Sequence, residues 1–254
     1  MTIKKGGGKW EFDNGKLHKV FPSNLIPEEL GDKDTEDYRA FLLTLSVIFN
    51  DLKGLIILHD TLPDIYRKPP DEETSSHSGE YNGLEIQLLR MLFATLHEFL
   101  EFIKEKHKIY EGKYFQQLLS SCSRNTQQIW TILSDTSRRV SPVNSEMNKL
   151  KELADKLQQI RDNISFHYQT RKKLMEGFRR FFYGIMKITP EAKKWVFWSG
   201  TKTSFGDIHF YYADAALQGY LEEKDTSKAF ELMSLIAKAI SDVLLEYHEK
   251  LPNR

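Results

Sequence analysis

Apolar residues recur at intervals of three and four positions along most of the chain. This spacing predicts a long helix over about residues 35–60, with an acidic, cap-like start at 34–37 and an end at Pro63. Residues three and four apart lie on one side of a helix, so this helix has a single apolar face that packs on a core. The residues of the face are Tyr38, Phe41, Leu42, Leu45, Ile48, Phe49, Leu52, Leu55 and Ile56.

The same periodicity predicts six further helices. They cover about residues 82–109, 114–136, 146–164, 174–188, 207–223 and 226–249. Met91 falls on the apolar stripe of the first of them and Cys122 on that of the second. Short connections that contain Gly112 or Pro142 separate neighbouring helices. Long amphipathic helices with short connections favour an all-α fold, here an antiparallel up-and-down helical bundle with additional helices.

Three segments lack this periodicity. Residues 1–33 contain turn and breaker residues and are expected to be irregular. Residues 67–80 are rich in Pro, Ser and Glu and are expected to form a surface loop. Residues 189–206 surround the aromatic run 195–198 and are expected to form an irregular excursion or a short hairpin. In this interpretation, residues 34–254 make up a single helical domain.

Composition restricts the possible functions and locations. The chain has 254 residues, with 36 basic and 36 acidic residues, so its formal net charge is zero. Binding of a polyanion therefore requires a local segregation of charge. A single cysteine excludes a disulfide framework and a multi-cysteine zinc site. No stretch reaches the ~18 uninterrupted apolar residues of a membrane span, and the first residues do not resemble a signal peptide. We therefore expect a cytoplasmic protein without membrane contact.

Motifs of the common catalytic chemistries are missing from the sequence. The eight histidines form no His-x3-His pair and no Glu-x-x-His. The sequence has no Walker loop, no Gly-x-Gly-x-x-Gly before a helix and no Gly-x-Ser-x-Gly. His97 and His248 are expected on solvated helix faces, and Cys122 is expected to be a core thiol. Neither a metal nor a cofactor is predicted.

Residues 161–202 differ from the rest of the chain in charge. They hold ten Lys or Arg residues and three acidic residues, so the segment carries a charge of +7 in a neutral protein. Aromatic residues are interleaved with these charges, from Phe166 to Trp198. Positive charge attracts phosphates, and exposed rings stack on unpaired bases, which favours a nucleic-acid interface. The alternative is that the rings, above all within 178–188, belong to the core and the charges form a solvated face.

Arg161, Asp162 and His167 form the one set of groups in the sequence that is suited to phosphodiester chemistry. His167 could transfer a proton to or from a ribose oxygen, and Arg161 could stabilise charge on the phosphorus. Asp162 could orient either of them. Six residues of straight helix advance ~9 Å and leave side chains about 120° apart. Arg161 and His167 therefore act together only if the helix bends between them or a second subunit contributes. The alternative is a surface Arg–Asp pair beside a core histidine.

This arginine and histidine, with a polar residue directly after the arginine and Tyr168 after the histidine, resemble the motif of the HEPN superfamily. The resemblance covers eight residues and the helical setting of roughly 85–250, and the long helix before that core and the aromatic excursion depart from a minimal domain. It implies a homodimer that joins two motif copies in one cleft. It also implies metal-independent RNA cleavage, as in toxins or defence proteins, some of which have an antitoxin partner.

From this resemblance and the basic segment together we expect two groups of functional residues. The catalytic residues are Arg161, Asp162 and His167, and the RNA-binding residues are Tyr168, Arg171, Lys172, Lys173 and Arg179. Two other functions stay open. One is a non-catalytic helical module that binds RNA, nucleotides or protein through the same basic and aromatic groove. The other is a purely structural helical partner in a larger complex.

Overall fold

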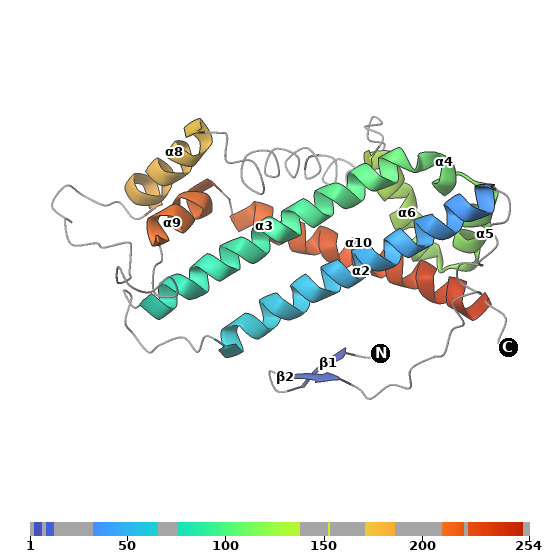
Figure 1. Ribbon diagram of the computed structural model, residues 1–254, viewed down its shortest axis with the longest axis horizontal. Helices are drawn as coiled ribbons and strands as arrows, with labels where there is room; N and C mark the ends of the chain where they lie inside the picture. The colour runs from blue at the N-terminus through green and yellow to red at the C-terminus, as the bar shows by residue number, and fades with distance from the viewer. Residues whose placement is uncertain are drawn as a thin grey trace.

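The structure is a computed structural model, and it describes residues 3–6, 9–12, 33–65, 76–137, 152, 171–185, 210–220 and 223–250. These residues form an all-α fold with one short hairpin near the N-terminus. Three long helices run along the length of the molecule (Figure 1). They are α2 (Lys33–Ile65), α3 (Ser76–Glu105) and α10 (Glu223–Lys250). The colour gradient in Figure 1 shows that α2 runs in the direction opposite to both α3 and α10.

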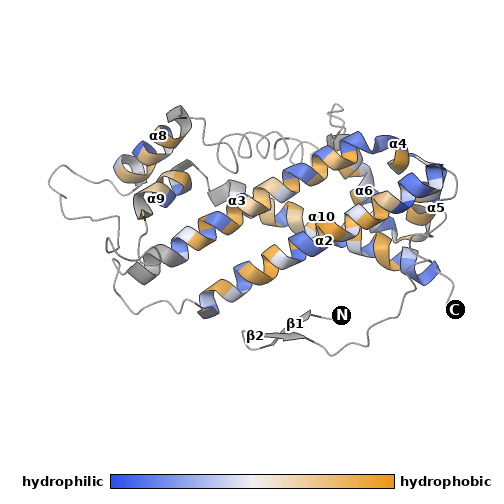
Figure 2. Cartoon of the chain, viewed as in Figure 1, coloured by the Kyte–Doolittle hydropathy of each residue, from blue (hydrophilic) through white to orange (hydrophobic). Residues whose placement is uncertain are grey.

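The core lies where these three helices contact one another. Each helix turns one apolar side inward, and polar and apolar residues alternate along all three helices in Figure 2. α2 contributes Phe41, Leu45 and Leu52 to the core, and every residue expected on its apolar face is buried or half-buried. The 3.6-residue periodicity therefore placed this helix face correctly. The buried face of α10 includes Met233, Ile236, Ile240 and Val243.

Three short helices close one end of the core (Figure 1). They are α4 (His107–Tyr110), α5 (Lys113–Ser121) and α6 (Arg124–Ser137). Trp130 of α6 is fully buried, and its Nε1–H donates a hydrogen bond of 3.0 Å to the carbonyl oxygen of Ala239 in α10. The rings of Phe99, Tyr110 and Phe115 surround the indole, with centroids 5.1–6.4 Å away. Rings from α3, α4 and α5 thus pack against Trp130 of α6 in one aromatic cluster, and the indole hydrogen bond links this cluster to α10.

At the opposite end lie α8 (Arg171–Arg179), a π-helical turn η2 (Arg180–Ile185) and α9 (Tyr211–Tyr220) (Figure 1). α8 and α9 cross at a pair of glycines. A Cβ atom placed on Gly219 would lie 2.1 Å from the carbonyl oxygen of Gly177 and 2.9 Å from Cβ of Phe181. Real Cβ atoms do not come this close to a backbone, so only glycine at 219 permits this crossing. The contact fixes α8, and with it the basic segment, against α9.

The helix expected over 114–136 is interrupted in the structure. α5 ends at Ser121, Cys122 has an extended backbone with φ −73° and ψ 166°, and α6 begins at Arg124. Ser123 explains the new start, because its Oγ accepts a hydrogen bond of 3.2 Å from the backbone N–H of Thr126. A serine side chain that binds an N–H group three residues later is a helix N-cap. The expected helix over 82–109 is likewise divided, at Lys106 between α3 and α4.

Other expected boundaries also shift. α2 continues to Ile65 and includes Pro63, since a proline in the last turn disrupts little helix beyond it. Residues 76–80, expected in a loop, are the first residues of α3. Met91, expected to be buried, is 44% exposed. Within the segment expected to be irregular, Ile3–Gly6 (β1) pairs with Lys9–Phe12 (β2) in an antiparallel hairpin. The two residues between the strands are both glycine.

Several expected elements lie outside the described residues. These are most of the helix over 146–164, of which only Glu152 is described, and the aromatic excursion over 189–206.

α2 meets the length and composition criterion for a membrane-spanning helix, which no segment of the sequence was expected to meet. The helix Lys33–Asp64 is long and apolar enough to cross a membrane, because an 18-residue window within it has a mean hydropathy of 1.8. Core helices and N-terminal signal sequences satisfy the same criterion, so the cytoplasmic location stays a prediction.

Candidate nucleic-acid interface

The residues expected to act in catalysis, Arg161, Asp162 and His167, lie outside the described residues, as does Tyr168. The bend or second subunit that would bring Arg161 and His167 together therefore stays a prediction. The described chain resumes at Arg171, which is the first residue of α8 and lies four positions after His167. Along the chain, α8 is thus the described helix that is nearest to the motif.

The segment from α8 through η2 is strongly basic. It contains Arg171, Lys172, Lys173, Arg179 and Arg180, and a single acidic residue, Glu176. The described side chains begin at Leu174, so the first three basic residues are placed on the helix only by their backbone. The side chains of Arg179 and Arg180 are exposed. The structure therefore places Arg179, one of the expected RNA-binding residues, on the surface.

The outer face of this segment combines charge with exposed apolar groups. Met175, Arg179 and Tyr183 follow one another at intervals of four residues, close to one helical turn. Met175 is 50% exposed and Tyr183 is 65% exposed. A guanidinium group and a solvent-exposed aromatic ring on one face can bind a phosphate and stack on a base. We call Met175, Arg179, Arg180 and Tyr183 the α8 face.

The inner face of the same segment explains where the other aromatic residues go. The rings of Phe178 and Phe182 lie 4.4 Å apart by centroid, and those of Phe181 and Phe182 lie 5.1 Å apart. Phe182 is buried and the other two are half-buried. These three rings pack within the α8–η2 segment, so they do not form an open stacking surface. The interpretation of this stretch as core is confirmed for Phe182.

Three residues of the α8 face, Met175, Arg180 and Tyr183, were not singled out from the sequence. Arg180 and Tyr183 belong to the basic, aromatic segment, but both lie in the π-helical turn η2. A π turn changes the angle between successive side chains, and π turns occur often at functional sites. The spacing of four residues from Met175 through Arg179 to Tyr183 was visible in the sequence and could have identified the ring.

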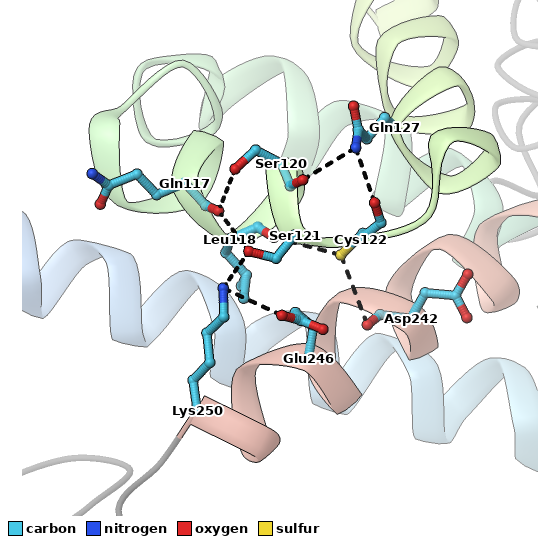
Figure 3. Close-up of polar contacts among 9 residues, drawn as sticks. All are labelled: Gln117, Leu118, Ser120, Ser121, Cys122, Gln127, Asp242, Glu246 and Lys250. Atoms are coloured by element: carbon cyan, nitrogen blue, oxygen red, sulfur yellow. Dashed lines mark hydrogen bonds and ion pairs between the residues drawn. The ribbon is translucent and has the colours of Figure 1, made fainter.

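A second group of polar side chains lies at the other end of the molecule, around Cys122 (Figure 3). The carbonyl oxygen of Cys122 accepts a hydrogen bond of 2.9 Å from Gln127 Nε2. The Sγ atom of Cys122 lies 3.6 Å from the carbonyl oxygen of Leu118 and 4.0 Å from the carbonyl oxygen of Asp242. Lys250 of α10 donates to Ser121 Oγ and pairs with Glu246 at 3.3 Å. These contacts fasten α10 to the corner between α5 and α6.

Cys122 is not poised to act as a nucleophile. Burial, together with the nearby carboxylates of Glu246 and Asp242, raises the pKa of its thiol from 9.0 to about 11, against the opposing effect of Lys250. Thiolate is the reactive form, and a raised pKa leaves almost none of it at pH 7. The expectation of an unreactive thiol agrees with this direction, although the side chain is half-buried rather than fully enclosed.

We therefore expect the folded protein to react slowly with iodoacetamide at pH 7, with a rate that rises about tenfold per pH unit until the thiol ionises. The folded protein holds this proton more tightly than the unfolded chain does. The thiol thus contributes stability that is fully present below pH 9.0 and is lost as the pH rises through about 11. Mass spectrometry of timed reactions between pH 7 and 10 measures the rate. Complete labelling within minutes at pH 7 in the folded state would contradict the expectation.

Other chemistry-bearing groups in the described part of the chain do not form a substrate site. His97, expected on a solvated face, is buried, with Nδ1 at 3.9 Å from Glu98 Oε1. The helix rotation puts this residue next to Leu96 on the core side of α3 rather than outside. His59 lines a small pocket between α2, α3 and α10, whose volume of about 10 Å³ is far below that of ordinary ligand sites. Within the described ranges, no group of three metal-binding side chains converges.

No family model, curated protein or solved structure matches this chain. A function for it is therefore supported by the chemistry of the motif residues and by the composition and exposure of the α8 face.

Proposed function

We propose that this protein binds single-stranded RNA on the α8 face and cleaves it without a metal ion through Arg161 and His167. The observation that carries the proposal is the exposure of Arg179 at the end of α8 and of Arg180 and Tyr183 in the adjoining turn η2. This segment begins four residues after His167. The residues that would hold an RNA strand therefore follow closely, in the sequence, the groups suited to phosphodiester chemistry.

The cleavage chemistry needs only groups that the chain itself supplies. His167 would accept the proton of a ribose 2′-hydroxyl, whose oxygen then attacks the adjacent phosphorus. Arg161 would stabilise the negative charge that grows on the non-bridging oxygens. The 5′-oxygen would leave with a proton returned by the protonated His167, and the other product would keep a 2′,3′-cyclic phosphate. Asp162 would orient Arg161 or His167 by a hydrogen bond.

RNA suits the α8 face for two reasons. Arginine binds phosphate oxygens through a planar fork of N–H groups, and the exposed Arg179 presents such a fork, with the positive charge of Arg180 beside it. Tyr183 presents an open ring, and an aromatic ring contributes about 1–3 kcal/mol when an unpaired base stacks on it. Stacking requires bases that are not already paired, which favours loops and single strands.

A second function is supported by the same exposed residues. The α8 face can bind RNA without any catalytic group, so a non-catalytic RNA-binding protein would present the same surface. The two functions differ in a simple assay. Total RNA is incubated with the purified protein in EDTA, and its length distribution is followed over time. Shortening of the RNA supports the nuclease, and a mobility shift at constant length supports the binding protein.

We expect the double substitution Arg179→Ala/Arg180→Ala to weaken RNA binding and to reduce the slope of log Kd against log salt concentration. Each lost phosphate contact lowers that slope by about 0.7 for single-stranded RNA. Fluorescence anisotropy with a labelled oligonucleotide at several salt concentrations measures both effects. A matched control is Lys108→Ala/Arg124→Ala, which removes two exposed basic residues from the opposite end of the molecule.

Equal losses of affinity in both double variants would contradict an RNA site on the α8 face, because they would indicate general attraction to positive charge. Tyr183→Ala tests the stacking contribution separately. It should weaken binding by about 5- to 150-fold, which corresponds to the 1–3 kcal/mol of one stacked base, while leaving the salt dependence unchanged.

A further inference from the structure

A stripe of apolar and small residues runs along the side of α2 that faces away from the core. Its members, at alternating intervals of three and four residues, are Ala40, Leu43, Val47, Asn50, Gly54, Ile57 and Thr61. At 100° per residue this stripe lies roughly opposite the buried face formed by Phe41, Leu45 and Leu52. Leu43 is 52% exposed and Val47 is 53% exposed. We call these seven residues the α2 stripe.

The two threonines on and beside the α2 stripe, Thr61 and Thr44, bind back to their own helix. Thr61 Oγ1 donates to the carbonyl oxygen of Ile57 at 2.8 Å, and Thr44 Oγ1 donates to that of Ala40 at 2.9 Å. Their hydroxyl groups are therefore satisfied, and their methyl groups can face a neighbour. A heptad-like spacing of such residues is the pattern by which one helix packs along another.

Gly54 gives the second observation. A glycine inside a helix costs about 1 kcal/mol relative to alanine. At Gly54 the fold does not require it, because an added Cβ atom would meet nothing within 4 Å. Gly219 differs in this respect, since the Gly177 backbone occupies its space. A glycine with open space on a helix surface suits the close approach of a side chain from another molecule.

The charges on α2 indicate whether a lipid bilayer or a second copy of the chain could cover the α2 stripe. α2 carries six acidic and three basic residues, so an anionic bilayer surface would repel it. A crossing of the bilayer would require the buried side of α2 to leave the protein core. A second copy of α2 is complementary, because in an antiparallel pair Arg39 of one copy comes to lie beside Asp60 of the other, twice by symmetry.

We propose that the α2 stripe is a dimer interface, in which two copies of α2 pack antiparallel around a two-fold axis between residues 48 and 49. This register places Leu43 against Gly54, Ala40 against Ile57 and Val47 against Asn50 of the second copy. Each large side chain thus faces a smaller or polar one. The flanking pairs are Arg39 with Asp60, and Ser46 with Lys53.

Neighbouring registers are less favourable. A shift of one heptad in one direction brings Lys53 against Lys53, and a shift in the other direction brings Arg39 against Lys53. A parallel pair would put Gly54 against Gly54 and leave a gap in the seam. Like charges and unfilled space both disfavour association, so charge and shape select the same antiparallel register. This inference is independent of the proposed RNA cleavage.

The test is the mass of the full-length protein in solution, measured by light scattering during size-exclusion chromatography. The wild type should have twice the monomer mass of 29.7 kDa. Gly54→Leu should shift the protein to monomer, because the new side chain meets Leu43 of the second copy. Its melting temperature in the monomeric state should not fall, since the site is open and leucine favours helix. Leu245→Glu, at a 59% exposed leucine on α10, should leave the dimer unchanged.

A charge exchange tests the register. Arg39→Asp and Asp60→Arg should each raise the dimer dissociation constant about tenfold or more, and the double variant Arg39→Asp/Asp60→Arg should restore most of the loss. A monomeric wild type over the accessible concentration range would overturn the proposal. So would a dimer that Gly54→Leu and the charge variants leave intact. Binding of a monomeric wild type to phosphatidylcholine vesicles that is lost in Val47→Glu would also overturn it, in favour of lipid.

Discussion

Replacement of His167 by alanine is expected to lower the rate of RNA cleavage by about 10²–10⁴-fold, because proton transfer by a positioned side chain contributes that much to catalysis. RNA affinity should change little, since Arg179, Arg180 and Tyr183 remain. The rate is measured under single-turnover conditions in EDTA with a labelled oligonucleotide. Addition of imidazole should recover part of the rate in the variant if the lost group is a proton carrier.

Two companion variants make this result specific. Arg161→Ala should lower the cleavage rate by about 10²–10³-fold through loss of charge stabilisation, and imidazole should not restore it. His248→Ala removes an exposed histidine from the end of α10 and should leave the rate unchanged. An unaltered rate in His167→Ala, with a folded protein, would remove this residue from the chemistry.

Replacement of Trp130 by alanine is expected to lower the free energy of unfolding by about 3–5 kcal/mol. The indole is fully buried, three aromatic rings contact it, and its N–H donates to Ala239 of α10. Removal leaves a cavity at the point where five helices meet. Urea denaturation followed by circular dichroism measures the change, as the midpoint shifts at constant slope.

Trp130→Phe keeps most of the volume and loses the hydrogen bond, so its cost should be clearly smaller than that of Trp130→Ala. Tyr183→Ala is the matched surface control. The tyrosine is 65% exposed, and the substitution should change the unfolding free energy by less than about 0.5 kcal/mol. A loss below about 1 kcal/mol in Trp130→Ala would show that the cluster does not hold the short helices to α10.

The long helices could be predicted from the sequence because their buried residues recur with one strong helical period. α2 and α10 were expected within a few residues of their bounds, and the residues expected to be buried in them are buried or half-buried. Met91 was misplaced on α3, because a side chain at the edge of an apolar stripe can face either core or solvent. The all-α class follows from these helices and is confirmed.

The division of α5 from α6 illustrates why periodicity alone was insufficient. The apolar spacing continues through Leu119, Cys122 and Ile129 without a change of phase, so the pattern gives no sign of a break. The break depends on a local competitor, the Ser123 side chain, which binds the N–H of Thr126 and starts a new helix. The N-cap residue was visible in the sequence but lay within a regular pattern.

The candidate site, too, could be predicted from the sequence only in part. Composition located the basic segment, and exposure then separated Arg179, Arg180 and Tyr183 on the outside from Phe178, Phe181 and Phe182 on the inside. Charge and ring content cannot make that separation, because it depends on the tight α8–α9 crossing at Gly219. Arg161, Asp162 and His167 lie outside the described residues, so their roles have to be tested by measurements in solution.

The most direct test of the functional proposal is the chemistry of the cleaved ends. A single-stranded RNA oligonucleotide is incubated with the protein in EDTA, and the products are analysed by mass spectrometry beside a substrate with one 2′-deoxyribose at the cleaved position. The proposal predicts 2′,3′-cyclic phosphate ends that wild type forms and His167→Ala does not, and no cleavage at the deoxyribose. Intact RNA after prolonged incubation, or cleavage that His167→Ala or the 2′-deoxy substitution leaves unchanged, would contradict it.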